Sequence, residues 1–174
     1  MPITQQTIAI IGDHGKMGSA IAKGIVGGNY RLLLFGEKSE HLNSLAETLY
    51  AEHPKAEIKV IDCAYECSWE ADIIILDIPK AYEKKIAEKI HDVATQKIIV
   101  RIAGQFHEES PNADDRLQSR LPHSKNVTVF KHKTKPRVII SGDDQEALQS
   151  ISELLKTADF NVSITLKPLK TGTY

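Results

Sequence analysis

The stretch Ile8-Ala-Ile-Ile-Gly-Asp-His-Gly-Lys-Met-Gly18 decides the fold predicted for this chain. A short apolar run leads into a turn with the glycine spacing G-x-x-G-x-x-G, and an apolar pattern at helical spacing follows as far as Val26. A strand, a tight glycine turn and a helix in this order are typical of a dinucleotide site. Glycine lets the backbone approach a pyrophosphate, and the helix N-terminus offers the phosphates free N–H groups. The alternative is a structural turn in another α/β fold.

The composition of the 174-residue chain is that of an ordinary globular domain, with 41% hydrophobic residues. Its formal net charge of −1 excludes a general electrostatic affinity for nucleic acids or membranes. The start of the chain lacks the features of a signal peptide, and no apolar run is long enough to cross a membrane. Cys63 and Cys67 do not form a C-x-x-C motif, and their number fits a reducing compartment. We therefore expect a cytoplasmic protein without nucleic-acid or membrane partners.

Predicted strands and helices alternate along almost the whole chain. Continuous apolar runs such as Asp72-Ile-Ile-Ile-Leu-Asp-Ile-Pro79 suit parallel strands that helices cover on both faces. The pattern predicts one doubly wound α/β domain over residues 1–174, a Rossmann-type fold with a mostly parallel sheet of about eight strands. The strands are expected at 7–11, 31–35, 57–61, 72–78, 97–102, 126–130, 138–141 and 161–166. The helices are expected at 16–26, 40–52, 82–94, 113–121 and 144–157, with a helical turn near 65–69.

Several further segments share their pattern and order with one family of proteins. They are Gly36-Glu-Lys38, Ala71 to Pro79, Leu121-Pro-His-Ser-Lys-Asn-Val-Thr-Val-Phe130, Val138-Ile-Ile-Ser-Gly-Asp-Asp-Gln-Glu-Ala147 and Lys167-Pro-Leu169. With the glycine turn, these segments resemble the NADP-dependent oxidoreductases that reduce coenzyme F420, an 8-hydroxy-5-deazaflavin, and their relatives. The resemblance implies hydride transfer between a nicotinamide and a flavin or deazaflavin-type acceptor.

The sequence departs from this family at three places. The Ser-Arg pair that usually holds the 2′-phosphate is replaced by Glu37-Lys38. After Phe130 the chain continues with the basic stretch 131–137 in place of the usual longer loop. The chain ends soon after Leu169, where relatives continue into a segment that helps to build the acceptor site. Cofactor binding is therefore better supported than catalysis.

Candidate site residues follow from the rule that ligands of a doubly wound sheet lie beyond the carboxyl ends of its strands. Hydride transfer asks the protein mainly to hold two rings face to face, so no catalytic side chain is assigned. NADP is favoured over NAD because Lys38 and Ser39 can hold a phosphate, although Glu37 at the ribose points to NAD. The cofactor-binding prediction comprises Gly12, Asp13, His14, Gly15, Lys16 and Met17 at the pyrophosphate, Gly36, Glu37, Lys38 and Ser39 at the adenine ribose, Ile78 and Pro79 near the middle, and Ala103 and Gly104 at the nicotinamide.

Other chemistries lack support in the sequence. The seven histidines show no metal-ligand spacing with cysteines or carboxylates, so no metal is expected. Asp143 and Asp144 are interpreted as helix N-terminal residues, since carboxylates there stabilise the helix dipole. Trp69 is expected to be a packing residue.

The sequence leaves open an alternative function, the assembly of the protein and the role of one basic loop. The chain could be a non-catalytic dinucleotide-binding or regulatory module, whereas a small relative of pyrroline-5-carboxylate or prephenate reductases is disfavoured because their helical C-terminal domain is missing. A homodimer is one assembly left open. The loop Lys131-His-Lys-Thr-Lys-Pro-Arg137 is either a solvated hairpin or a basic segment that attracts an anionic, flavin-like acceptor.

Overall fold

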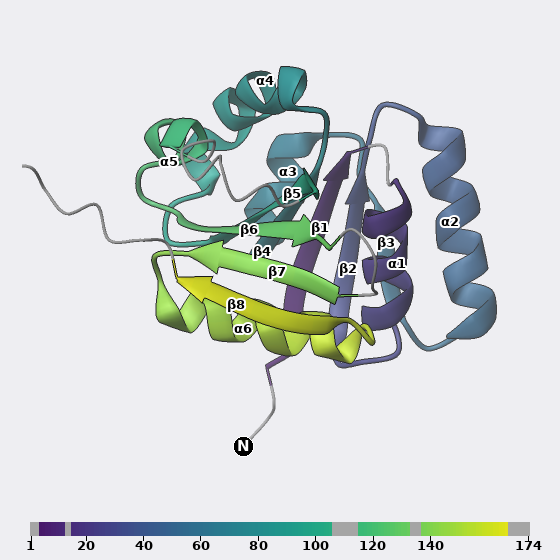
Figure 1. The fold of residues 1–174 in the computed structure, drawn as a ribbon. Helices are drawn as coiled ribbons and strands as arrows, with labels where there is room; N and C mark the ends of the chain where they lie inside the picture. The colour runs from purple at the N-terminus through teal and green to yellow at the C-terminus, as the bar shows by residue number, and fades with distance from the viewer. Residues whose placement is uncertain (1–3, 13–14, 106–114, 133–136, 167–174) are drawn as a thin grey trace, which may run out of the picture.

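The structure is a computed structural model that describes residues 4–12, 15–105, 115–132 and 137–166. Within these residues the chain builds one eight-stranded sheet covered by helices (Figure 1). The strands are β1 (Gln6–Gly12), β2 (Tyr30–Phe35), β3 (Glu57–Val60), β4 (Ile73–Asp77), β5 (Ile98–Gln105), β6 (Lys125–Lys131), β7 (Arg137–Gly142) and β8 (Asn161–Leu166). The helices are α1 (Lys16–Ile25), α2 (Ser39–Glu52), α3 (Ala64–Glu70), α4 (Lys80–Ile90), α5 (Asp115–Arg120) and α6 (Gln145–Thr157), with a 3-10 turn at His91–Val93.

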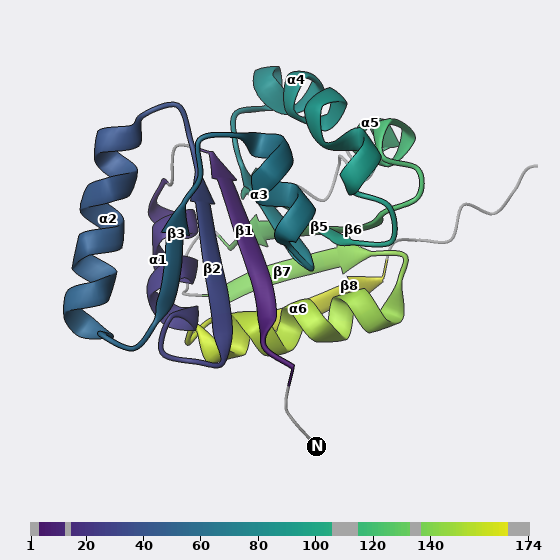
Figure 2. The same cartoon turned by 180° about the vertical axis from the view of Figure 1, so that it is seen from behind.

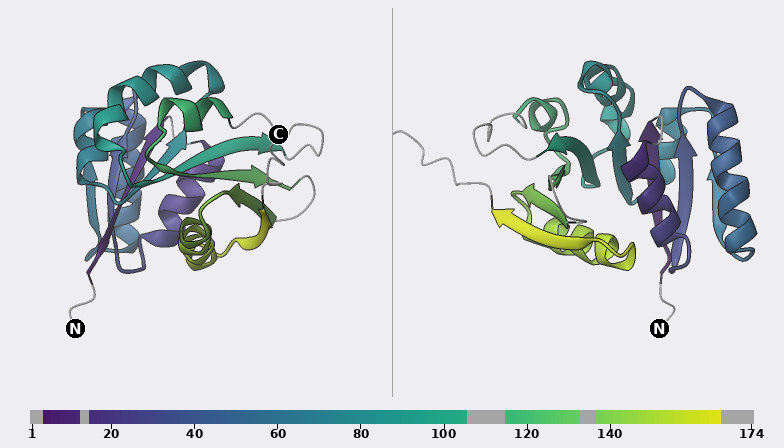
Figure 3. Two further views of the ribbon diagram at one scale, coloured as in Figure 1. Left: turned by 90° about the vertical axis from the view of Figure 1, so that its left-hand side faces the viewer. Right: turned by 45° about the vertical axis from the view of Figure 1, so that its right-hand side comes forward.

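The strand order across the sheet is β3-β2-β1-β4-β5-β6-β7-β8. The first six strands in the chain run parallel to one another, so their carboxyl ends meet at one edge of the sheet, which we call the carboxyl edge. β7 is antiparallel to β6, and β8 is parallel to β7. The sheet twists strongly, since β1 and β2 run nearly vertically in Figure 1 while β6 to β8 run nearly horizontally. Figure 3 shows the same twist from two further sides.

Helices cover both faces of the sheet and bury two apolar clusters. One cluster joins α1, α2 and α6 to the strands, and α1 lies in front of them in Figure 1. The other joins α3, α4 and α5 to the opposite face, which is seen from behind in Figure 2. Apolar side chains of β1 and β4 alternate between the two clusters, because successive residues of a strand point to opposite faces. This double burial explains the continuous apolar runs of these strands.

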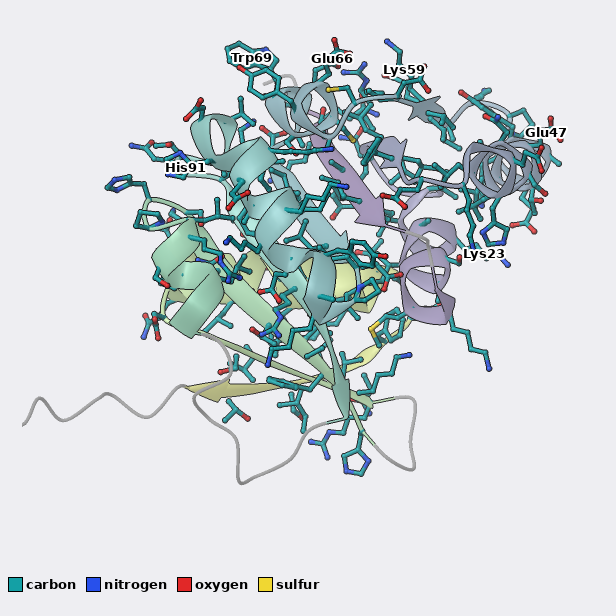
Figure 4. All side chains as sticks on the ribbon, turned by 90° about the horizontal axis from the view of Figure 1, so that it is seen from above. Lys23, Glu47, Lys59, Glu66, Trp69 and His91 are labelled. Carbon is teal, nitrogen blue, oxygen red and sulfur yellow. The ribbon has the colours of Figure 1, made fainter. Side chains whose placement is uncertain are left out.

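The structure confirms the predicted fold class and the predicted alternation of strands and helices. The expected helix at 82–94 differs in detail: α4 begins at Lys80, directly after Pro79 at its N-cap, and a 3-10 turn follows it. No helix in the described ranges is long and apolar enough to cross a membrane. The packing role expected for Trp69 is wrong, because its side chain is 65% exposed and points outward from α3 (Figure 4). It stacks on Tyr65 instead, with ring centroids 6.3 Å apart.

Candidate functional site

The three central strands end together at the carboxyl edge. In the register of the sheet, Gly12 of β1 pairs with Asp77 of β4, and Ile11 pairs with Phe35 of β2. The turns after these strands therefore meet at one place, where β1 leads to α1, β2 to α2, and β4 to α4. This is the position that the sequence analysis assigned to a dinucleotide.

Gly12 is required by the packing of the strands themselves. Its φ of +139° is rarely adopted by residues with a side chain, and a Cβ there would lie 2.0 Å from the carbonyl oxygen of Asp77. Gly36 is equally constrained, because a Cβ at this residue would lie 2.3 Å from the carbonyl oxygen of Gly12. Two of the predicted site glycines thus let three chain segments approach closely, whether or not a ligand binds.

Gly15 and Gly18 have different surroundings, although both belong to the glycine turn. A Cβ on Gly18 would lie 2.3 Å from the Oδ2 atom of Asp77, so this glycine allows α1 to pack against the end of β4. A Cβ on Gly15 would lie 3.6 Å from the same atom, which is ordinary van der Waals contact. Gly15 is also exposed and has a φ of −59°, which any residue can adopt. The fold therefore does not require glycine at position 15.

The N-terminus of α1 is open toward the carboxyl edge. Gly15 is its N-cap and offers no side-chain hydrogen bond, and its first turn contains no acidic residue. Its first N–H groups and the positive end of its dipole suit an anion. Lys16 is exposed, whereas the Met17 side chain is buried in the core, which leaves only the Met17 backbone for a ligand. The predicted residues Asp13 and His14 lie outside the described residues.

Asp77 is a charged residue at this site that the sequence analysis did not select. Its Oδ2 atom is buried and has no hydrogen-bond partner among the described residues. It lies beside the first turn of α1, as its distances to the Cβ positions of Gly15 and Gly18 show. An unpaired buried carboxylate oxygen is costly, and the positive end of the helix dipole offsets part of this cost. A sequence signal existed, because Asp77 interrupts the apolar run from Ile73 to Ile78.

A pocket lies between the end of β2 and the helix α4, and we call it the α4 pocket. Apolar side chains from both sides form most of its lining, and the charged side chain of Glu37 comes from the turn after β2. The lining residues are Ile11, Gly12, Phe35, Gly36, Glu37, Ile78, Pro79, Tyr82, Lys85, Ile86 and Lys89. An apolar slot with a few polar groups is the usual form of a small-molecule site.

The α4 pocket brings together only part of the predicted set. Gly12, predicted at the pyrophosphate, Gly36 and Glu37, predicted at the adenine ribose, and Ile78 and Pro79, predicted near the middle of the dinucleotide, all line it. The predicted Lys38 does not line it and is the exposed N-cap of α2. Ser39 is the first residue of that helix.

The pocket also includes residues that the sequence analysis missed. Tyr82, Lys85 and Lys89 come from α4, and no motif marked them.

Ala103 and Gly104 lie near the end of β5 at the same edge, outside the α4 pocket. Ala103 is half-buried, while Gly104 is exposed, and a Cβ there would meet no atom of the described residues within 4 Å. One buried ion pair ties this strand to α4, since the Nε atom of Arg101 lies 3.4 Å from the Oε2 atom of Glu83. The pair fixes α4 and β5 relative to each other, so both walls of the site are held in place.

Among the described residues two side chains, Cys67 and Lys97, have clearly shifted pKa values, and neither lines the α4 pocket. Burial raises the pKa of the Cys67 thiol from 9.0 to about 12, so this residue is not a nucleophile at neutral pH. Burial lowers the pKa of Lys97, and the carboxylate of Asp72 partly opposes this effect. Lys97 serves the fold, because its Nζ atom donates to the carbonyl oxygen of Trp69 over 2.8 Å and so ties the end of α3 to β5. The described ranges contain no cluster of three His, Cys, Asp or Glu residues that could hold a metal.

Comparison with known proteins decides the family of this chain. The sequence model of the family described as NADP oxidoreductase coenzyme F420-dependent matches residues 7–105. The chain belongs to this family. The match runs from β1 to the end of β5 and includes the glycine turn, the α4 pocket and Gly104. The resemblance seen in the sequence is thereby confirmed, and the chain is a member of a nicotinamide-dinucleotide-dependent oxidoreductase family.

Several solved structures share the fold of this chain. A hypothetical protein from Sinorhizobium meliloti is 19% identical with a TM-score of 0.69, and the match covers 94% of this chain and 86% of that one. A candidate F420-dependent NADP-reductase from Arthrobacter sp. FB24 is 17% identical with a TM-score of 0.69, covering 92% and 84%. A pyrroline-5-carboxylate reductase from Coxiella burnetii is 15% identical with a TM-score of 0.73, and this chain spans only 59% of its length. No curated protein sequence matches the chain.

Proposed function

We propose that the chain is an NADP(H)-binding oxidoreductase that transfers hydride between the nicotinamide and a flavin or deazaflavin-type acceptor. The observation that carries this proposal is the uncapped N-terminus of α1 beside the apolar α4 pocket, within the segment that matches the family. An anion site beside a mostly apolar pocket suits a dinucleotide, because such a ligand combines a diphosphate with a flat base.

The residues at the carboxyl edge fit the parts of this cofactor. The backbone around Gly15 and Lys16 would hold the diphosphate, and the open backbone at Gly15 leaves room for its approach. The apolar side of the α4 pocket, with Pro79 and Ile78, would hold the adenine, and Glu37 stands where the adenine ribose is expected. Asp77 adds negative charge beside the same helix terminus, so we expect it to weaken anion binding.

The bound cofactor would supply the hydride, and the protein would hold and orient the cofactor. In the proposed reaction the chain has three tasks: to bind the diphosphate at α1, to orient the adenosine in the α4 pocket, and to leave the nicotinamide facing Ala103 and Gly104 at the end of β5. The Arg101–Glu83 ion pair holds this strand against α4 and thus keeps the two halves of the site in register. The hydride transfer itself needs no side chain to accept or donate a proton, and the reduced acceptor ring can take up its proton from solvent, so no catalytic residue is proposed.

NADP is proposed over NAD. The family description favours NADP, while the carboxylate of Glu37 would repel a 2′-phosphate and accept ribose hydroxyls. Lys38 at the N-cap of α2 stands next to Glu37 and can contribute a compensating charge. A cytoplasmic location and a homodimer remain part of the proposal.

A second proposal is a dinucleotide-binding module without turnover. The basic stretch 131–137 favours it, because it replaces the longer loop that usually follows Phe130 in the family. An assay of NADPH oxidation with a panel of flavins, deazaflavins and quinones separates the two proposals. Turnover with a deazaflavin or flavin supports the enzyme. Tight NADPH binding by calorimetry without turnover on any member of the panel refutes the enzyme and favours the module.

A further inference from the structure

The helix α4 carries two different charge patterns on neighbouring flanks. Lys84 and Glu88 stand one turn apart, with their charged atoms 3.9 Å apart, and both are well exposed. Lys85 and Lys89 also stand one turn apart, but they line the α4 pocket. Among the described residues neither of these two lysines has an ion-pair partner. On one flank of α4 the charges of Lys84 and Glu88 thus balance, whereas the flank with Lys85 and Lys89, which we call the pocket flank, carries a positive charge.

A pair of like charges one turn apart on a helix is unfavourable in itself, whereas an opposite pair such as Lys84–Glu88 is favourable. An anion that binds between Lys85 and Lys89 reverses the sign of this interaction. The apolar stems of both lysines can lie along the helix while their ammonium groups reach the rim of the pocket. The pocket flank of α4 is therefore suited to a compact, multiply charged anion such as a phosphate group.

Glu37 lines the same pocket from the turn after β2. A carboxylate at this position would repel a phosphate on the adenine ribose, and one exposed lysine at position 38, outside the pocket, offsets it only in part. The two exposed ammonium groups of Lys85 and Lys89 at the rim of the pocket outweigh one carboxylate. The charges of the pocket lining thus sum to +1, from Lys85 and Lys89 against Glu37.

We propose that Lys85 and Lys89 form the seat of the adenosine 2′-phosphate and thereby make the chain selective for NADP over NAD. This inference rests on the proposed function, because it requires a dinucleotide in the α4 pocket. Selectivity is then carried by lysines of α4, which line the same pocket as Glu37, rather than by the turn after β2 alone. Flexible lysines attract a phosphate as point charges and need no fixed fork geometry, which suits their place at an open rim.

The test compares NADPH and NADH binding by calorimetry in variants that replace the charged ammonium group by a neutral polar group. Lys85→Gln and Lys89→Gln remove one charge each, and the double variant removes both. Lys84→Gln is the matched control, because it makes the same charge change one residue away on the exposed flank. Glutamine has nearly the helix propensity of lysine, so all variants should fold, and circular dichroism with thermal melting checks this.

We expect each single variant to weaken NADPH binding by about 3-fold to 5-fold and the double variant by at least about 10-fold, with NADH changed by less than about 2-fold. The control should leave both affinities within about 2-fold, and Lys38→Ala should change the NADPH-to-NADH ratio less than the double variant does. The fragments 2′-AMP and 5′-AMP separate the ribose phosphate from the diphosphate. Only 2′-AMP should lose affinity in the double variant.

Three results would overturn the inference. Equal losses for NADPH and NADH, or for both fragments, would assign the lysines to the diphosphate or the base. Unchanged NADPH binding in the double variant would leave the lysines as solvated surface groups while the proposed function stands. A wild-type protein that binds neither dinucleotide would remove the proposed function together with this inference.

Discussion

Gly15→Val separates ligand binding from folding at the glycine turn. A Cβ at this position would lie 3.6 Å from the nearest atom, the Oδ2 atom of Asp77, and the backbone is in a region open to valine. An unfavourable N-cap costs up to about 1 kcal/mol. Replacing glycine also lowers the conformational entropy of the unfolded chain, which stabilises the folded protein by about 0.4–1 kcal/mol. The free energy of unfolding should therefore change by less than about 1 kcal/mol, or about 2–4 °C in melting temperature.

The same substitution should be severe for the proposed ligand. The isopropyl group would stand over the first N–H groups of α1, where a diphosphate must approach. Hydrogen bonds to a charged group are worth about 1.5–3 kcal/mol each, so losing two costs at least about 3 kcal/mol. That corresponds to more than about a 100-fold loss in NADPH affinity. Calorimetry measures the affinity and a thermal melt measures the fold; unchanged affinity in a folded Gly15→Val protein would refute the diphosphate site.

Three further results are expected. Lys38→Ala should weaken NADPH binding by a few-fold and NADH binding less, as measured by calorimetry; a wild-type preference for NADH would reverse the choice of cofactor. Replacing Lys131, Lys133 and Lys135 of the basic loop together by serine should raise the apparent KM for an anionic acceptor and flatten the salt dependence of that KM. Unchanged binding of both cofactor and acceptor at low salt would show that the loop is only a solvated turn. A thiol reagent should modify the exposed Cys63 in the native protein and Cys67 only after unfolding, because burial raises the pKa of Cys67 to about 12. Between pH 9 and about 12 the unfolded chain loses this proton first, so the contribution of Cys67 to stability should fall with rising pH in that window; rapid labelling of both thiols at neutral pH would contradict the assignment.

The strand arrangement supports the predicted position of one end of the basic loop 131–137. The sequence analysis placed its start at the ligand side of the sheet, and β6 does run parallel to β5, so Lys131 stands at the carboxyl edge. Arg137 at the far end of the loop is engaged elsewhere, because its Nε atom donates to the Oγ atom of Ser163 over 2.8 Å. Residues 133–136 lie outside the described residues. Attraction of an acceptor by this loop stays a prediction.

The fold could be predicted because its signals are local. Runs such as Ile73 to Leu76 are apolar without interruption only where helices cover both faces, and the glycine turn marks the first crossover. The N-terminal role expected for Asp144 is confirmed, since it is the N-cap of α6 and its side chain accepts a hydrogen bond from the N–H of Ala147 over 2.8 Å.

The missed site residues depend on contacts between distant segments. Lys85 and Lys89 differ from Lys84 only in which flank of α4 faces the end of β2, and that flank is set by the packing of the whole helix. Asp77 matters because α1 lies against it, which nothing within β4 reveals. Trp69 was misjudged because a large aromatic residue usually packs inside, whereas here it lies on the outer side of a short helix. Residue type and spacing thus predicted elements well and side-chain partners poorly.

The helix α6 completes an apolar cluster of the fold although it lies outside the segment that matches the family. The family signature ends with β5, at residue 105, and contains the whole glycine turn and the α4 pocket. The apolar cluster beneath α1 is nevertheless closed by α6, whose Leu148, Ile151 and Leu155 are buried in it. The two helices also meet closely at Gly24, where a Cβ would lie 2.3 Å from the Cα atom of Ala158. A fragment that ends with the matched segment would contain the glycine turn and the α4 pocket and yet expose the apolar side of its own first helix, so the packing of α1 depends on residues beyond position 105.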